Sequence, residues 1–109
     1  MPSAPKADNR DPVYFRHCQD LCRSFRGQCF VTGDHTGLVP HHVLPKGVNG
    51  DLGMDLKGNI VLLTQWLHYL SNDSAHALGH YTLFDEAHGV DSLAEAHRLR
   101  ALYLETGGE

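Results

Sequence analysis

Two short apolar segments, separated by a glycine-rich stretch, constrain the fold of this chain more than any other feature. The first is "LVPHHVLP" over residues 38–45, and the second is "NIVLLT" over residues 59–64. Apolar runs of this length, bounded by proline and glycine, are typical of β-strands. The stretch between them, "KGVNGDLGMDLKG", is rich in the residue that most often marks loops. The sequence therefore predicts two strands joined by a flexible loop.

A helix is expected before the first strand, over residues 11–27. Asp11 can cap its N-terminus, Pro12 suits the first turn, and Gly27 can end it. Its apolar residues recur at helical spacing and would form one stripe; they are Phe15, Cys18, Cys22 and Phe25. The following segment, residues 28–39, has β-branched residues separated by glycine and predicts a turn or hairpin.

Helical patterns also follow the second strand. The segments are residues 64–73, residues 75–89 (a turn and a short helix) and residues 91–107. Thr64 can cap the first of them, whereas Asp91 or Ser92 can cap the last, which Gly107 would end. One face of this last helix is apolar and carries Leu93, Ala96, Leu99 and Tyr103.

Length and composition limit the class of protein. A chain of 109 residues fits one domain, which we expect over residues 11–109, after a loose polar leader over residues 1–10. No apolar run approaches the roughly 18 residues of a membrane span, and the first residues lack the apolar core of a signal peptide. Three cysteines without a CxxC spacing argue against a disulfide framework and favour the cytoplasm.

Charge is distributed unevenly along the chain. A net charge of −4 with neutral histidines does not by itself indicate a nucleic-acid partner. The net negative charge is concentrated in the C-terminal half, so a basic edge nearer the N-terminus could still meet phosphate groups. The basic residues expected to contact a DNA backbone are Arg23, Arg26, Lys46 and Lys57.

Histidine is unusually frequent, with nine in the chain, and two of them are adjacent. His41 and His42 fall in the first predicted strand, where neighbouring side chains point to opposite faces. The two rings can therefore have different functions. His68 follows in the helix predicted after the second strand.

These patterns occur in an order that resembles the HNH endonuclease family, the ββα-metal nucleases. The resemblance rests on "CFVTG", "HHVLPKG", "GMDLKGNIVLLT" and "LHYL", and covers about residues 10–100. The flanking segments are similar in layout to small phage and prophage HNH proteins, some of which are linked to DNA recombination. The resemblance implies an α+β fold: a ββα-metal core of a two-stranded antiparallel sheet and a helix, flanked by N- and C-terminal helices. It also implies metal-dependent hydrolysis of DNA phosphodiester bonds in the cytoplasm of a bacterial host.

The resemblance also implies the roles of individual residues. His41 would bind a metal ion, and His42 would be the general base. Asn59 would orient that base or hold the site, and His68 would be the second metal ligand. This set suits the chemistry, because phosphodiester hydrolysis needs an attacking water, a group that takes its proton, and positive charge near the phosphate.

A third metal ligand is expected shortly after His68. Asn72 stands at i+4 on the same face of a continuous helix and is the favoured candidate. Asp73 remains an alternative, and His76 becomes one if the helix ends early. Two imidazoles with oxygen donors suit one divalent ion, which could be Mg²⁺, Mn²⁺, Ni²⁺ or Zn²⁺.

The chain departs from the family in one respect. Many members carry two CxxC pairs that bind a structural zinc ion. Here Cys29 is present, but Thr32 stands where the second cysteine would be, and Thr64 and Leu67 stand where the other pair would be. We therefore expect no structural zinc knuckle, and an apolar core containing Trp66 in its place.

Several features also allow simpler interpretations. Cys18 and Cys22 are better explained as thiols on an apolar helix face than as metal ligands. The histidines expected only on the surface or as helix caps are His76, His80, His88 and His97. The main alternative to a nuclease is a non-catalytic HNH module that binds DNA or a phage packaging or recombination protein. A histidine-rich metal-binding protein is the second alternative.

Overall fold

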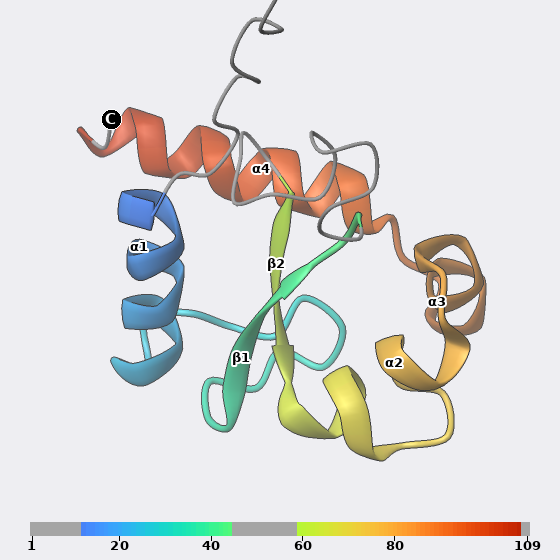
Figure 1. Cartoon of the computed structure of the whole chain (residues 1–109). Helices are drawn as coiled ribbons and strands as arrows, with labels where there is room; N and C mark the ends of the chain where they lie inside the picture. Colours follow the sequence, from blue (N-terminus) through green and yellow to red (C-terminus); the bar gives the residue numbers. More distant parts are fainter. Residues whose placement is uncertain (1–11, 45–58, 108–109) are drawn as a thin grey trace, which may run out of the picture.

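The structure, a computed structural model, describes residues 12–44 and 59–107. These residues form an α+β arrangement of helices around a two-stranded antiparallel sheet (Figure 1). In chain order the elements are α1 (Pro12–Arg23), β1 (Leu38–His42), β2 (Ile60–Thr64), the π-helix η1 (Trp66–Leu70), α2 (Ala75–Leu78), α3 (Tyr81–His88) and α4 (Ser92–Glu105). The mixed α+β class expected from the sequence is confirmed. The expected leader, the Asp11 cap and most of the loop between the strands lie outside the described residues.

Strand β2 separates two apolar cores. It pairs with β1 so that His41 lies opposite Val61 and His42 lies opposite Ile60. Because side chains alternate along a strand, one face of β2 joins a first core and the other face joins a second. The first core contains Cys29, Leu38, Val43, Val61, Leu63, Leu67, Phe84 and Ala96. The second core contains Tyr14, Cys18, Ile60, Leu62, Leu99 and Tyr103.

Helix α1 begins at Pro12, as expected, but ends at Arg23 rather than near Gly27. Phe25 has a φ of 61°, a left-handed backbone that cannot continue the helix, and its side chain is 65% exposed. Phe25 therefore does not belong to the predicted apolar stripe. Gly27 serves close packing instead of a helix end, because a Cβ there would lie 2.7 Å from Leu62 Cδ1.

The region after β2 is more broken than the predicted helix. Thr64 does cap its start, since its Oγ1 accepts a hydrogen bond from Leu67 N at 3.3 Å. The π-helix η1 then ends at Leu70. Trp66 is 62% exposed, so the expectation that it fills the core is wrong, and Leu67 is the η1 residue that packs there.

Helix α4 matches its prediction closely. Of the two candidate caps, Asp91 has the role, because its side chain accepts a hydrogen bond from Ala94 N. Ala96, Leu99 and Tyr103 are buried against the sheet. Figure 1 shows α4 crossing the molecule, with α1 near one end and α3 near the other. Within the described residues, no helix has the length and apolarity needed to cross a membrane.

Candidate functional site

Three histidines from three different elements meet beside the sheet. His41 lies in β1, His68 in η1 and His76 in α2. The ring centroids are 5.1 Å apart for His41 and His68, 4.6 Å for His68 and His76, and 6.4 Å for His41 and His76. This group, called the histidine cluster below, gathers imidazoles that are separate in the sequence.

The alternation of β1 explains why the paired histidines have different neighbours. His41 faces η1 and α2, whereas the ring of His42 stacks on Phe15 of α1, with centroids 5.6 Å apart and an angle of 16° between the planes. Both side chains nevertheless line the same cavity. They can therefore act on one bound group from two directions.

Burial and mutual repulsion keep two rings of the cluster neutral. The pKa of His41 is lowered to about 3, chiefly by burial and then by the neighbouring imidazoles of His68 and His76. The pKa of His68 is also lowered, again chiefly by burial and then by His76. An imidazole must be neutral to ligate a metal ion, so both rings hold a free nitrogen lone pair at ordinary pH.

The spacing of the cluster fits a single ion in part. With a metal–nitrogen bond of about 2.0–2.1 Å, two imidazoles on one tetrahedral ion have centroids about 5 Å apart, close to the two shorter separations in the cluster. Across residues 12–44 and 59–107, however, no three His, Cys, Asp or Glu side chains converge as a ready metal site. The rings would have to turn about their side-chain bonds to bind an ion together.

A cavity of about 520 Å³ opens beside the cluster. It is lined by His41 and His42 from β1, by His68, by His76 and by side chains from the start of α3, among them Tyr81 and Phe84. The cavity therefore joins His42, the predicted base, with the predicted ligands His41 and His68, but not with Asn72, in one concave surface.

Asn59 ties the ends of the two strands together. Its side chain is buried; Oδ1 accepts a hydrogen bond from Leu44 N at 2.8 Å, and Nδ2 donates one to Leu44 O at 3.4 Å. The backbone of Val43 also donates to Asn59 O at 2.9 Å. Asn59 thus extends the pairing of the sheet beyond His42 and holds the end of β1 in place.

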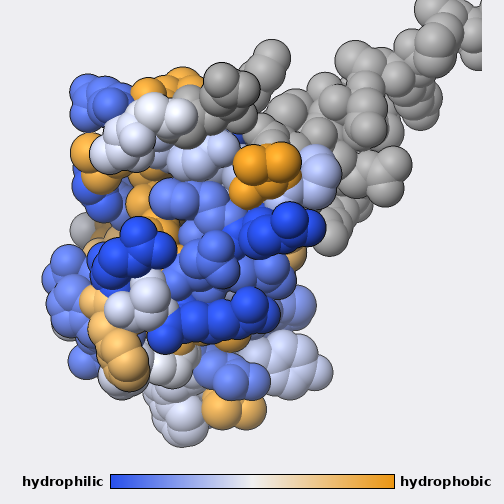
Figure 2. All heavy atoms as spheres, turned by 90° about the vertical axis from the view of Figure 1, so that its left-hand side faces the viewer, coloured by the Kyte–Doolittle hydropathy of each residue, from blue (hydrophilic) through white to orange (hydrophobic). Residues whose placement is uncertain are grey.

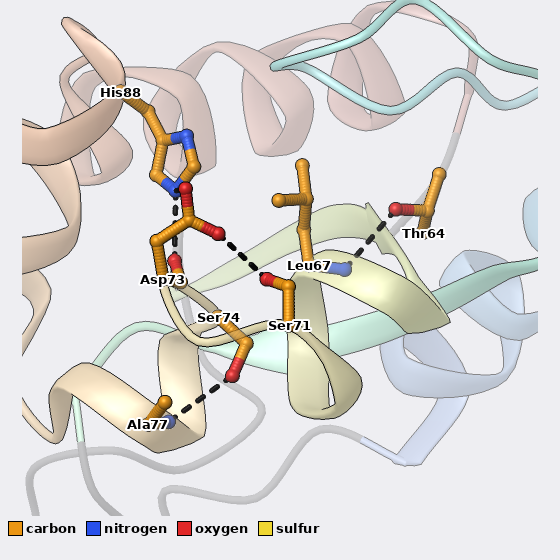
Figure 3. Close-up of polar contacts among 7 residues, drawn as sticks. All are labelled: Thr64, Leu67, Ser71, Asp73, Ser74, Ala77 and His88. Atoms are coloured by element: carbon orange, nitrogen blue, oxygen red, sulfur yellow. Dashed lines mark hydrogen bonds and ion pairs between the residues drawn. The ribbon is translucent and has the colours of Figure 1, made fainter.

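The turn between η1 and α2 is fixed by polar contacts (Figure 3). Ser71 Oγ donates to Asp73 Oδ1 at 2.7 Å, and Ser74 Oγ accepts from Ala77 N at 3.1 Å as the cap of α2. His88 Nε2 lies 2.8 Å from the carbonyl oxygen of Asp73; a carbonyl only accepts, so this nitrogen carries the proton. These contacts hold the turn that brings His76 back to His68.

The structure brings some expected site residues together and leaves others apart. Asn72 is exposed, and because η1 ends at Leu70 it does not lie one helical turn along from His68. His76 meets the condition set for it, an early helix end, and lies in the cluster. His76 is exposed, as expected for a surface residue, but its ring also contacts the other two rings of the cluster. A run of turn-forming residues at positions 71–74, "SNDS", is the sequence signal that could have shown the helix break.

Three further histidines were expected on the surface or as helix caps. His80 caps α3, because its Nδ1 accepts from Thr82 N at 3.2 Å, as expected. The side chain of His88 is only 11% exposed, so the expectation of a surface residue does not hold for it. His97 is exposed on α4.

The expected DNA contacts are only partly described. Arg23 and Arg26 are exposed, and the face that carries α1 is mostly hydrophilic (Figure 2). Neither arginine lines the cavity within the described part of the chain. Lys46 and Lys57 lie outside the described residues.

All three cysteines are free thiols, with Cys18 and Cys29 buried and Cys22 half-buried. Burial raises the pKa of Cys22 to about 11. This favours an inert thiol over a metal ligand, since ligation requires the thiolate.

No family model matches the chain, and no curated protein or solved structure is significantly similar to it.

Proposed function

We propose that the protein is a metal-dependent endonuclease of the HNH type that hydrolyses DNA phosphodiester bonds. The observation that carries the proposal is the meeting of His41, His68 and His76 at the cavity that His42 also lines. The order of the elements also supports it: His41 and His42 lie on β1, β2 follows, and His68 lies on the helix after β2, as in the ββα-metal core implied by the resemblance.

In this proposal His41, His68 and His76 are the metal ligands, and His76 replaces Asn72 as the third. A divalent ion held there would supply positive charge for the scissile phosphate and its leaving oxygen. The lowered pKa values of His41 and His68 support this role, since both rings are neutral and available to bind.

His42 is the proposed general base. Its ring lies on the other side of β1 from His41 yet reaches the same cavity, so it can take a proton from a water that attacks the bound phosphate. Phe15 stacks on this ring and limits its rotation. Asn59 holds the strand end that carries His42, through its hydrogen bonds to Leu44.

Incubation with supercoiled plasmid tests the proposal. Purified protein is mixed with plasmid and Mg²⁺, Mn²⁺, Ni²⁺ or Zn²⁺, and nicked and linear products are measured over time. We expect cleavage only with a divalent ion, and a loss of about 10²–10⁴-fold in His42→Ala. His97→Ala is the matched control, because His97 is exposed on α4 and should cleave at the wild-type rate.

Plasmid cleavage, DNA binding and metal binding together separate the nuclease from the two alternative functions. DNA binding without cleavage under every metal would favour a non-catalytic HNH module. Binding of several ions per chain, measured by calorimetry, would favour a histidine-rich metal-binding protein, whereas the nuclease needs one principal site.

A further inference from the structure

The cavity beside the histidine cluster is larger than a metal site needs. Its volume is about 520 Å³. One water occupies about 30 Å³ in the liquid, so an ion with a full shell of waters would fill about 200 Å³. Cavities of roughly 300–1,000 Å³ are typical of sites for organic ligands. More than half of the space is therefore left for another part of the substrate.

Flat rings line much of this remaining space. Phe15 of α1 stacks on His42, and Tyr81 at the start of α3 stacks on His80, with centroids 4.8 Å apart and planes at 26°. Phe84 of α3 also contributes to the wall. Figure 1 shows α1 and α3 on opposite sides of the sheet. Aromatic groups thus reach the cavity from two separate parts of the fold.

The lining also lacks strong charge. Among the described residues that line the cavity, none is Asp, Glu, Lys or Arg, and the apolar side chains include Pro40 and Val43. Such walls do not suit a run of phosphates, which need basic or amide donors. They suit a flat, neutral, aromatic group, and stacking on aromatic side chains is how proteins hold a base that has left the helix.

We propose that this cavity binds one unpaired nucleobase of the DNA strand, adjacent to the phosphate at the histidine cluster. The inference rests on the proposed nuclease function and narrows its substrate. A base within continuous duplex is paired and stacked, and extracting it costs free energy, whereas an unpaired base is already free to enter. DNA with a bulged or single-stranded base is therefore the preferred substrate over fully paired DNA.

Two matched DNA duplexes test this preference. They differ only in that one carries a single bulged 2-aminopurine, a fluorescent base whose emission falls when it stacks, and the other pairs that base with thymine. We expect the bulged duplex to be cleaved at least about tenfold faster, because only the paired duplex has to spend the few kcal/mol that unpairing and unstacking a base require. Without metal, its fluorescence should fall on addition of wild-type protein, and that of the paired duplex should not.

Substitutions on α3 test whether the preference for the bulged duplex comes from the cavity. Tyr81→Ala should bring the ratio of the two cleavage rates towards one, and Tyr81→Phe should restore it. Leu83→Ala is the control, because Leu83 lies on the same helix but is 51% exposed and does not line the cavity. If Tyr81→Ala does not fold, the fluorescence of the wild-type complex still decides the question.

The failures of the two proposals are distinguishable. Equal cleavage of both duplexes would overturn the base pocket and leave the nuclease standing. Absence of cleavage of both would overturn the nuclease. Unchanged 2-aminopurine fluorescence in the wild-type complex would overturn the base pocket whatever the cleavage result.

Discussion

The rings of His68 and His76 meet edge to face, with centroids 4.6 Å apart and an angle of 89° between the planes, although they belong to different helices. The contact depends on the end of η1 at Leu70 and on the turn that follows it. The ring of Tyr69, with its centroid 5.0 Å from that of His76, supports the same arrangement from the outer side. The helix break after Leu70 thus places His76 beside His68, whereas a continuous helix would separate the two rings.

Metal affinity should depend on His76 more than on Asn72. We expect His76→Ala to weaken binding of Ni²⁺ or Zn²⁺ by about tenfold or more, since even loss of a group that only supports a ligand has effects of that size. Asn72→Ala should change the affinity little, because Asn72 is exposed and lies beyond the end of η1. Isothermal titration calorimetry measures both. A larger effect in Asn72→Ala would restore the ligand first expected from the sequence.

The stability of the metal-free protein should fall as the pH drops below about 6.5. Unfolded His41 would titrate near its ordinary value of 6.5, whereas the pKa of the folded residue is about 3. Between these values the unfolded state binds one more proton than the folded state, so acid favours unfolding. This residue alone should lower the free energy of unfolding by about 2 kcal/mol at pH 5. His68 shifts the balance in the same direction.

Urea titrations at pH 5 and pH 7.5, with a chelator present, measure this dependence. His41→Gln should show a shallower loss of stability with acid, because glutamine does not titrate. His97→Ala, which removes an exposed histidine, should retain the wild-type slope. If the stability of His41→Gln and of the wild type fell equally with acid, His41 would not be the source of the pH dependence.

Asn59 should stabilise the fold as well as the site. Asn59→Ala removes the acceptor of Leu44 N and the donor to Leu44 O in a buried position. We expect the free energy of unfolding to fall by about 1–3 kcal/mol, the usual result of leaving a buried polar group unpaired. Asn72→Ala, an exposed asparagine, should change it by less than about 0.5 kcal/mol. Similar effects of the two substitutions in urea unfolding would refute this role.

Arg23 and Arg26 should contribute to DNA binding through charge alone. Each replacement by alanine should weaken binding equally across DNA sequences and lower the slope of log affinity against log salt by about 0.9. Arg98→Ala is the control, because Arg98 pairs with Glu95 on α4, with Nε and Oε1 2.7 Å apart. Fluorescence anisotropy over a range of salt concentrations provides the slopes. An unchanged slope in both variants would remove these arginines from the interface.

The elements that local patterns define were predictable. β1 and β2 follow from short apolar runs bounded by proline or glycine, and α4 follows from its apolar face and the Asp91 cap; these signals act over a few residues. The end of α1 was not predictable, because it depends on a contact between residues that are distant in the sequence. Gly27 has to approach Leu62 closely, and the chain reaches it through the left-handed backbone of Phe25.

Only those residues of the candidate site that are identified by their order along the sequence were predictable. His41, His42 and His68 stand out because their order matches a known arrangement of strands and helix. His76 joins them because η1 ends after five residues. The turn-forming residues 71–74 indicate that the helix breaks there, but not that the chain then returns His76 to His68. The cavity was not predictable either, since it depends on how α1 and α3 lie around β1.

The burial of both faces of β2 also affects what happens when the protein unfolds. Its sequence, Ile-Val-Leu-Leu-Thr, has no charge, no proline and no glycine, and strands of this kind form intermolecular sheets once exposed. In the folded chain the two cores shield this segment. Partial unfolding would release it, so heating or loss of either core should lead to aggregation before a soluble unfolded state accumulates.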